Sequence, residues 1–163
     1  LYSEIKENEI DPITGCTVCK EDQVEIDIAT IPSFKVCYLI APNIKAILVD
    51  LLSNDEPIFE IVGYRVGKTR GEVDDLGNRT GFSNHSFGIA VDINPDINGL
   101  YDNCLNFNQE CRLIKGGQWQ PNHPGSMTEN SMTVQAMEAI GFLWGGKISG
   151  KQKDFMHFSP TGY

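Results

Sequence analysis

The chain has 163 residues, 40% of them hydrophobic, which suffices for one domain with a buried core. Its 22 acidic side chains outnumber 13 lysines and arginines, and the formal net charge is −9. We therefore expect no nucleic acid partner and no anionic membrane surface, because both bind clustered basic side chains. No apolar run approaches the roughly 20 residues that a membrane span requires, so we expect no membrane span.

The first third of the chain predicts an arm, two strands and a helix. Residues 1–21 are polar and acidic and are expected to form an extended arm. Residues 24–28 alternate apolar and charged side chains, which is typical of a strand with one buried face, and the apolar residues 34–40 are a candidate second strand. A helix is expected to begin at Pro42, since isoleucines and leucines then recur every three or four residues.

The middle of the chain alternates short apolar runs with long polar stretches. A strand is expected over residues 58–64, which would deliver Arg65 at its end. Residues 68–81 are polar and glycine-rich and predict a long loop. Residues 88–93 predict a further strand, and the stretch 95–126 is expected to be irregular.

The last segments complete the predicted architecture. A second helix is expected over residues 130–140, followed by strand-like pieces at 142–144 and 155–158. Helices and strands do not alternate strictly, so the sequence predicts an α+β fold with a small antiparallel sheet and flanking helices. We divide the chain into residues 1–40, an N-terminal arm and first strands packed on or extending the domain, and a main domain of residues 41–163.

Five cysteines leave more than one interpretation open. Cys16 and Cys19 form a C-x-x-C pair, which is typical of a redox motif or of half a zinc site. Cys104 and Cys111 have six residues between them, too many for a matching second pair. Disulfides in an extracytoplasmic protein are favoured, with Cys104–Cys111 the simplest bond, although a phage or cytoplasmic origin stays open. Because the count is odd, at least one thiol is unpaired or pairs between chains.

Two short segments, residues 83–95 and 154–158, hold the residues expected to carry chemistry. His85, Asp92 and His157 supply two imidazoles and a carboxylate, which are donors that zinc prefers, and a catalytic zinc keeps a further position for water. An isolated histidine is more often structural, but two of the three histidines lie in these segments, each near an aspartate. The sequence therefore predicts a site for one Zn²⁺ ion.

Asp154 is the predicted general base of this site. It lies three residues before His157 and would take a proton from the attacking water and pass it to the leaving amine. Positions three apart on a regular strand face opposite sides, so the two side chains share a site only if the chain bends or bulges between them.

Four further residues are candidates for substrate contact. Arg65 and Arg70 could hold a substrate carboxylate or stabilise an oxyanion, and Arg65 is favoured because it ends a predicted strand. Ser83 is a weaker candidate, since a hydroxyl in this loop is expected to bond the loop itself. Trp144 is expected in the core, with the wall of a cleft as the alternative.

These motifs resemble those of the M15 family of zinc peptidases. The family pattern S-x-H-x-x-G-x-A-x-D is met at every fixed position of residues 83–92. The patterns W-G-G and D-x-x-H-F are met at residues 144–146 and 154–158, and residues 63–65 are similar to the arginine segment of the family. The resemblance implies that the two histidines and Asp92 bind zinc, that Asp154 is the base and that Arg65 assists.

The resemblance also implies a fold, an activity and a substrate. The fold would be that of an M15 peptidase or a hedgehog domain, with the zinc site in a cleft on the sheet. The activity would be hydrolysis of stem peptides in peptidoglycan or muropeptides. D-Ala-D-Ala carboxypeptidase activity is expected first, because Ile93-Asn94-Pro95 is similar to the carboxypeptidase branch. An endolysin-like L-Ala-D-Glu endopeptidase and a non-catalytic zinc-containing binding module are the alternatives. Ile148 and Ser159 depart from the residues that many relatives carry there.

Overall fold

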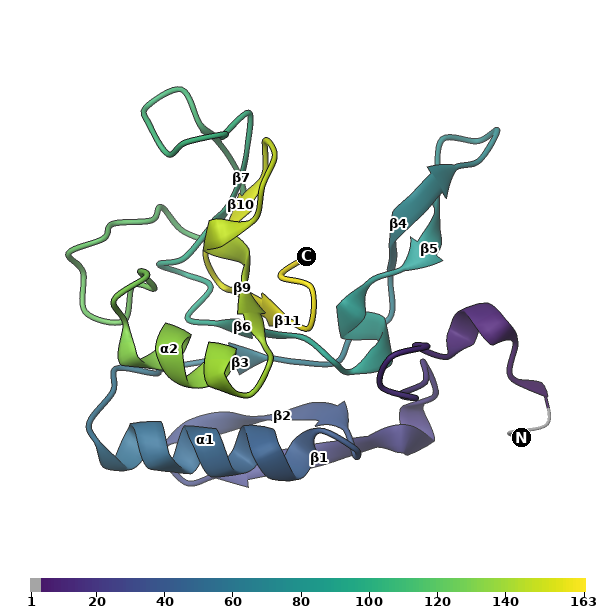
Figure 1. Cartoon of the computed structure of the whole chain (residues 1–163), viewed down its shortest axis with the longest axis horizontal. Coiled ribbons are helices and arrows are strands. Elements are labelled where there is room, and N and C mark those ends of the chain that lie inside the picture. The colour runs from purple at the N-terminus through teal and green to yellow at the C-terminus, as the bar shows by residue number, and fades with distance from the viewer. Residues whose placement is uncertain (1–3) are drawn as a thin grey trace.

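The computed structural model describes residues 4–163 as an α+β protein with two α-helices and several small antiparallel sheets (Figure 1). This class was predicted, but the strands divide among four sheets instead of forming one. Among residues 4–163 no helix has the length and apolar character needed to cross a bilayer. The proposed division at residue 40 stays a prediction.

The N-terminal layer consists of a hairpin and a helix that lie side by side (Figure 1), and their buried apolar side chains belong to the same core cluster. Strands β1 (Gln23–Ile28) and β2 (Ile31–Cys37) pair antiparallel, and α1 (Ala41–Ser53) lies beside β1. The predicted apolar stripe of α1 is confirmed, because Ile44 and Leu48 are fully buried in the main core. Burial of this stripe accounts for the stability of a helix that carries no side-chain cap.

A four-stranded antiparallel sheet forms the centre of the molecule, with the strand order β3-β6-β11-β9. Its strands are short: β3 (Ile61–Val62), β6 (Val91–Ile93), β9 (Leu143–Trp144) and β11 (His157–Ser159). The second helix, α2 (Met132–Ala139), contacts both α1 and β9. Every residue of β6 and β11 is buried, so these two strands run through the core.

Two arms rise from this base on either side of the C-terminal segment (Figure 1). One is a hairpin of β4 (Lys68–Val73) and β5 (Arg79–Phe82). The other is a three-stranded sheet, β10-β7-β8, made of β7 (Leu100–Asp102), β8 (Arg112–Lys115) and β10 (Lys153–Asp154).

The expected loop over residues 68–81 is wrong, because this segment forms most of the β4–β5 hairpin. The stretch 95–126, expected to be irregular, contains strands β7 and β8. Most side chains of the hairpin are exposed, so it lacks the alternation of apolar and polar residues from which a strand is predicted. Backbone pairing holds the two strands, together with hydrogen bonds from the Arg79 and Thr80 side chains to carbonyls of β4, and Gly71 adopts a left-handed φ of 76° where the register shifts.

The expected extended arm is also wrong for the described part of residues 1–21. Short 3-10 turns lie at Glu7–Glu9 and Lys20–Asp22, and Ile10 pairs with Thr17 in an isolated bridge. Residues 1–3 of the expected arm lie outside the described residues. A disulfide from this segment to the end of β2 explains why a polar, acidic stretch is folded onto the domain.

Two disulfides account for four of the five cysteines. Cys104 bonds Cys111, as predicted, and Cys16 bonds Cys37, leaving Cys19 as a free, half-buried thiol. The redox and zinc interpretations of the C-x-x-C pair are therefore wrong, because Cys16 is fully buried and already bonded to a distant partner.

We expect the Cys16–Cys37 bond to contribute about 3 kcal/mol to stability, since it closes a loop with a sequence separation of 21. The double variant Cys16→Ser/Cys37→Ser should lose that amount of unfolding free energy in urea titrations. The matched control Cys19→Ser, which breaks no bond, should change it by less than about 0.5 kcal/mol. Equal stabilities for the two variants would contradict the assigned pairing.

Candidate metal centre and active site

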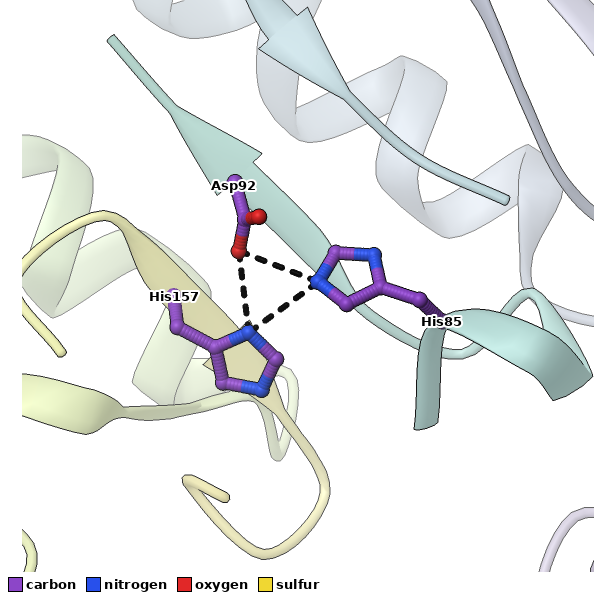
Figure 2. A group of neighbouring side chains, drawn as sticks. All are labelled: His85, Asp92 and His157. Carbon is purple, nitrogen blue, oxygen red and sulfur yellow. Dashed lines mark hydrogen bonds and ion pairs between the residues drawn. The ribbon is translucent and has the colours of Figure 1, made fainter. Parts of the chain in front are cut away.

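Three elements that are distant in the sequence place one side chain each at the same point (Figure 2). His85 comes from the 3-10 turn Asn84–Phe87, Asp92 from β6 and His157 from β11. The antiparallel register sets His157 directly opposite Asp92. The turn begins with a hydrogen bond from the Ser86 backbone N–H to the Ser83 side chain and ends at Gly88, in the left-handed conformation. Strand register and turn geometry together therefore fix the three positions.

The ligand atoms of these residues converge closely enough to share one ion. Asp92 Oδ1 lies 3.0 Å from His85 Nε2 and 2.9 Å from His157 Nδ1, and the two nitrogens are 3.2 Å apart. His85 Nδ1 lies 2.8 Å from the Gly63 carbonyl, to which it donates, so Nε2 presents its lone pair to the centre. All three side chains are buried, and they are the one group of this kind among residues 4–163.

The charges at this centre fit a cation. Burial alone would raise the pKa of Asp92, but hydrogen bonds from His157 and His85 hold it well below its usual range. Burial would lower the pKa of His157, yet its bond to Asp92 and the charges of Asp92 and Asp154 raise it. In the absence of a metal the centre thus favours a proton on the His157 imidazole. Two imidazole nitrogens and one carboxylate oxygen within 4.8 Å of one another are a donor set suited to zinc.

Asp154 reaches the same region through the chain bend that its spacing from His157 requires. It ends β10, which pairs with β7, and a turn at residues 155–156 then leads into β11 of a different sheet. Its buried Oδ1 has no hydrogen-bond partner. Burial raises the pKa of Asp154 to about 6; the charge of Asp92 adds to this shift, while His157, Lys115 and Arg65 oppose it. Asp154 is therefore a carboxyl group whose proton affinity suits proton transfer near neutral pH.

Arg65 is tied to the centre through Asp92. Its Nη2 donates to Asp92 Oδ2 at 3.0 Å, so both oxygens of this carboxylate are engaged. Arg65 does not end a strand, as the sequence suggested, because β3 covers only Ile61–Val62. Its backbone N–H instead bonds the His85 carbonyl at 3.2 Å, which connects the segment after β3 to the turn. The Arg65 side chain remains 44% exposed, so other N–H groups of its guanidinium are available on the open side.

The centre opens into a pocket of about 650 Å³ between the two arms. Besides Arg65, His85, His157 and Asp154, its lining includes the predicted contact residues Ser83 and Arg70. Ser83 Oγ lies 3.1 Å from Ser86 Oγ, as expected of a hydroxyl that organises the turn. Trp144 does not line this pocket; its indole is buried and donates to the Phe155 carbonyl at 2.8 Å.

Sequence reasoning missed several polar residues that line the pocket, among them Arg79, Lys115 and Asn84. Arg79 lies on the hairpin that was expected to be a loop, and Lys115 on a strand of the stretch expected to be irregular. The cluster Asp74-Asp75-Leu76-Gly77-Asn78 between two polar runs was the available turn signal for the hairpin. Asn84 donates to the Tyr163 carbonyl at 2.7 Å, a contact across 79 positions that no local pattern reveals.

A comparison with protein families matches residues 77–160 to a family of M15 peptidases described as D-alanyl-D-alanine carboxypeptidase. The matched segment contains both histidines of the centre, Asp92 and Asp154. No curated protein and no solved structure matches the chain.

We expect one zinc ion to bind per chain, with an affinity that falls as the pH drops through the raised pKa of His157. The metal must displace the proton at Nδ1, which costs about tenfold in affinity per pH unit for each proton displaced. Competition with a chromophoric chelator across this range measures the slope. His157→Gln should abolish stoichiometric binding, whereas His123→Gln, at an exposed histidine outside the centre, should leave it intact. Tight binding to the His157 variant would contradict the assigned ligands.

We expect Gly88→Ala to loosen the turn that carries His85. At Gly88 a β-carbon would lie 1.9 Å from Gln23 Oε1 and 2.6 Å from the Cys37 backbone nitrogen, at a φ of 66°. The control Gly77→Ala has a comparable φ of 84° with open space around it, so it should lose only the backbone term of about 1 kcal/mol. Gly88→Ala should lose about 2 kcal/mol more in thermal unfolding and bind zinc more weakly. Equal losses at the two positions would show that the close approach has no energetic role.

Proposed function

Because the chain belongs to the M15 peptidase family, matched over residues 77–160, we propose that it is a zinc-dependent peptidase that cleaves stem peptides of peptidoglycan. The proposal puts the D-Ala-D-Ala carboxypeptidase reaction first, following the family description. Cleavage between L-Ala and D-Glu is the alternative within the class, and a binding module without turnover is the alternative outside it.

One observation carries the proposal. A half-buried carboxylate with a buried, unpartnered oxygen, Asp154, lines the same pocket as His85 and His157, two of the three residues of the metal centre. A purely structural metal site has no need of a partly desolvated base beside it. The combination supports hydrolysis over simple metal storage.

A zinc ion held by His85, Asp92 and His157 would supply Lewis acidity, which lowers the pKa of water and polarises a carbonyl. Asp154 would accept the proton of the attacking water on its open oxygen and return it to the nitrogen of the leaving amine. The positive charge of a bound cation would pull the pKa of Asp154 below about 6, so the base is ionised at neutral pH.

Arg65 has two roles in this proposal. Its bond to Asp92 Oδ2 orients that carboxylate, so that Oδ1 faces the two imidazole nitrogens. Its remaining N–H groups, on the exposed side of the guanidinium, are suited to stabilise the oxyanion that forms when water attacks a peptide carbonyl.

We further propose that the protein works outside the cytoplasm, where its substrate is located. The two disulfides support this location, because such bonds persist in oxidising compartments and are rare in reducing ones.

We expect Asp154→Asn to lower kcat/KM by about 10²- to 10⁴-fold, since it removes the proton acceptor. The zinc-loaded variant and wild type would be incubated with a synthetic stem pentapeptide and with intact sacculi, and the products identified by mass spectrometry. In wild type, kcat/KM should fall on the acid side as pH drops through the pKa of Asp154, because only the ionised carboxylate accepts a proton.

The control Asp75→Asn alters an exposed carboxylate of the hairpin tip and should keep full activity. Release of D-Ala alone supports the carboxypeptidase reaction, and cleavage after L-Ala supports the endopeptidase. If zinc-loaded wild type and Asp154→Asn both leave every bond intact, the protein is not a peptidase of this kind.

A further inference from the structure

The pocket carries a charge opposite to that of the whole protein. Among the described residues 4–163, four cationic side chains line it and Asp154 is the one acidic side chain that does; the four are Arg65, Arg70, Arg79 and Lys115. The protein as a whole has a formal charge of −9. Concentrating positive charge in a concave site of an acidic protein attracts and orients an anionic ligand.

Arg70 differs from the other three cations. It lies on β4 with its side chain half-buried, and among residues 4–163 it forms no ion pair with a carboxylate. Burial lowers its pKa, and negative charge at Tyr163 partly offsets that effect. A guanidinium that is partly desolvated without a carboxylate partner is unfavourable unless a ligand supplies the missing charge.

The other cations are engaged or more hydrated. Arg65 is bonded to Asp92, and Nη1 of Arg79 donates to the Gly71 carbonyl at 2.8 Å. Lys115 is exposed on the second arm and offers a point charge without the planar fork of an arginine.

The strand pairing of the hairpin is irregular at Arg70. Pairing between β4 and β5 shifts register on both sides of this residue, and Gly71 follows with its left-handed φ of 76°. Gly81 lies opposite Arg70, and a β-carbon there would lie 2.9 Å from the Arg70 carbonyl carbon. Irregular pairing of this kind re-aims a side chain, and here that side chain lines the pocket.

We propose that Arg70 binds a carboxylate of the peptide substrate, and that the β4–β5 hairpin is the arm that holds the peptide by this charge. This inference rests on the proposed peptidase function and adds a specificity-determining residue to it. The bond formed is a two-pronged guanidinium–carboxylate pair, for which a planar fork of N–H donors is suited.

In a stem pentapeptide with lysine at its third position, two carboxylates could supply this charge: the C-terminal carboxylate and the free carboxylate of the D-Glu residue. The test therefore uses four synthetic peptides, namely the free acid, the C-terminal amide, the form with D-Glu amidated and the doubly amidated form. Binding is measured by calorimetry on zinc-loaded Asp154→Asn protein, so that no turnover is needed.

In this background Arg70→Gln should weaken binding of the free-acid peptide about 10- to 100-fold, in line with a hydrogen bond to a charged group. Amidating the recognised carboxylate should cause the same loss, and the two changes together should add little more. The carboxylate that Arg70 binds is the one whose amidation leaves Arg70→Gln with no further effect on peptide affinity. Arg70→Lys should recover part of the affinity, because it keeps the charge but not the fork.

Lys68→Gln is the matched control, since it removes one positive charge from the same strand outside the pocket. The affinity of the Lys68→Gln variant for the free-acid peptide should stay within about twofold of that of the Asp154→Asn protein without it. The inference is overturned if Arg70→Gln weakens all four peptides equally, if it weakens none, or if Lys68→Gln matches it. Digestion by wild type tests the peptidase function separately. If wild type cleaves no peptide but Arg70→Gln still weakens peptide binding as expected, the peptidase function is rejected and the binding role of Arg70 stands.

Discussion

The site depends on one strand register. In the central sheet, the pairing of β6 with β11 sets Asp92 directly opposite His157, which brings the carboxylate and an imidazole to 2.9 Å. Both strands are buried on both faces, so a slip by one residue would turn these two polar side chains away from each other and displace apolar residues from the core. The apolar packing that stabilises the sheet therefore also enforces the geometry of the metal centre.

Burial makes unbalanced charge in this centre energetically unfavourable. A carboxylate removed from water is stable only when its charge is balanced, and Asp92 has Arg65 on one oxygen and either a proton on His157 or a cation on the other. The contacts behind them remove other freedoms: Gly63 fixes the tautomer of His85, and Arg65 fixes the second oxygen of Asp92. The centre is thus arranged for a positive ion before one binds, and a proton competes with that ion for Nδ1 of His157.

The sequence predicted the α+β class, the helix at α1, the Cys104–Cys111 bond and the group of three residues that could hold a metal. The class, the helix and the disulfide follow from residue type and short-range spacing, which the sequence displays directly. The grouping of His157 with His85, which is 72 positions away, rested instead on two separate motifs that resemble those of the M15 family. The hairpin of β4 and β5 escaped prediction because its strands are mostly exposed, so no apolar alternation marks them. The bond between Cys16 and Cys37 was not predicted, because disulfide pairing depends on which segments lie close together in the fold. The spacing of Cys16 and Cys19 suggested a local C-x-x-C motif instead.

The two arms explain how an acidic protein can present a cationic pocket. Arg70 and Arg79 lie on one hairpin, and Lys115 lies on the opposite arm, so their charges add only in the folded chain. Interactions between exposed charges are screened over about 8 Å at physiological ionic strength, so the acidic exterior weakens the electrostatic field in the pocket less than the net charge suggests.

The two arms are stabilised by different interactions: backbone pairing in the hairpin, and a disulfide with stacked Trp119 and Phe155 rings in the other arm. The rings stack at 3.9 Å, and Phe155 is the residue after Asp154. Packing in that arm therefore fixes the Asp154 carboxylate, while the irregular pairing of the hairpin directs Arg70. The pocket between the arms thus has the proposed base on one side and cationic side chains on the other.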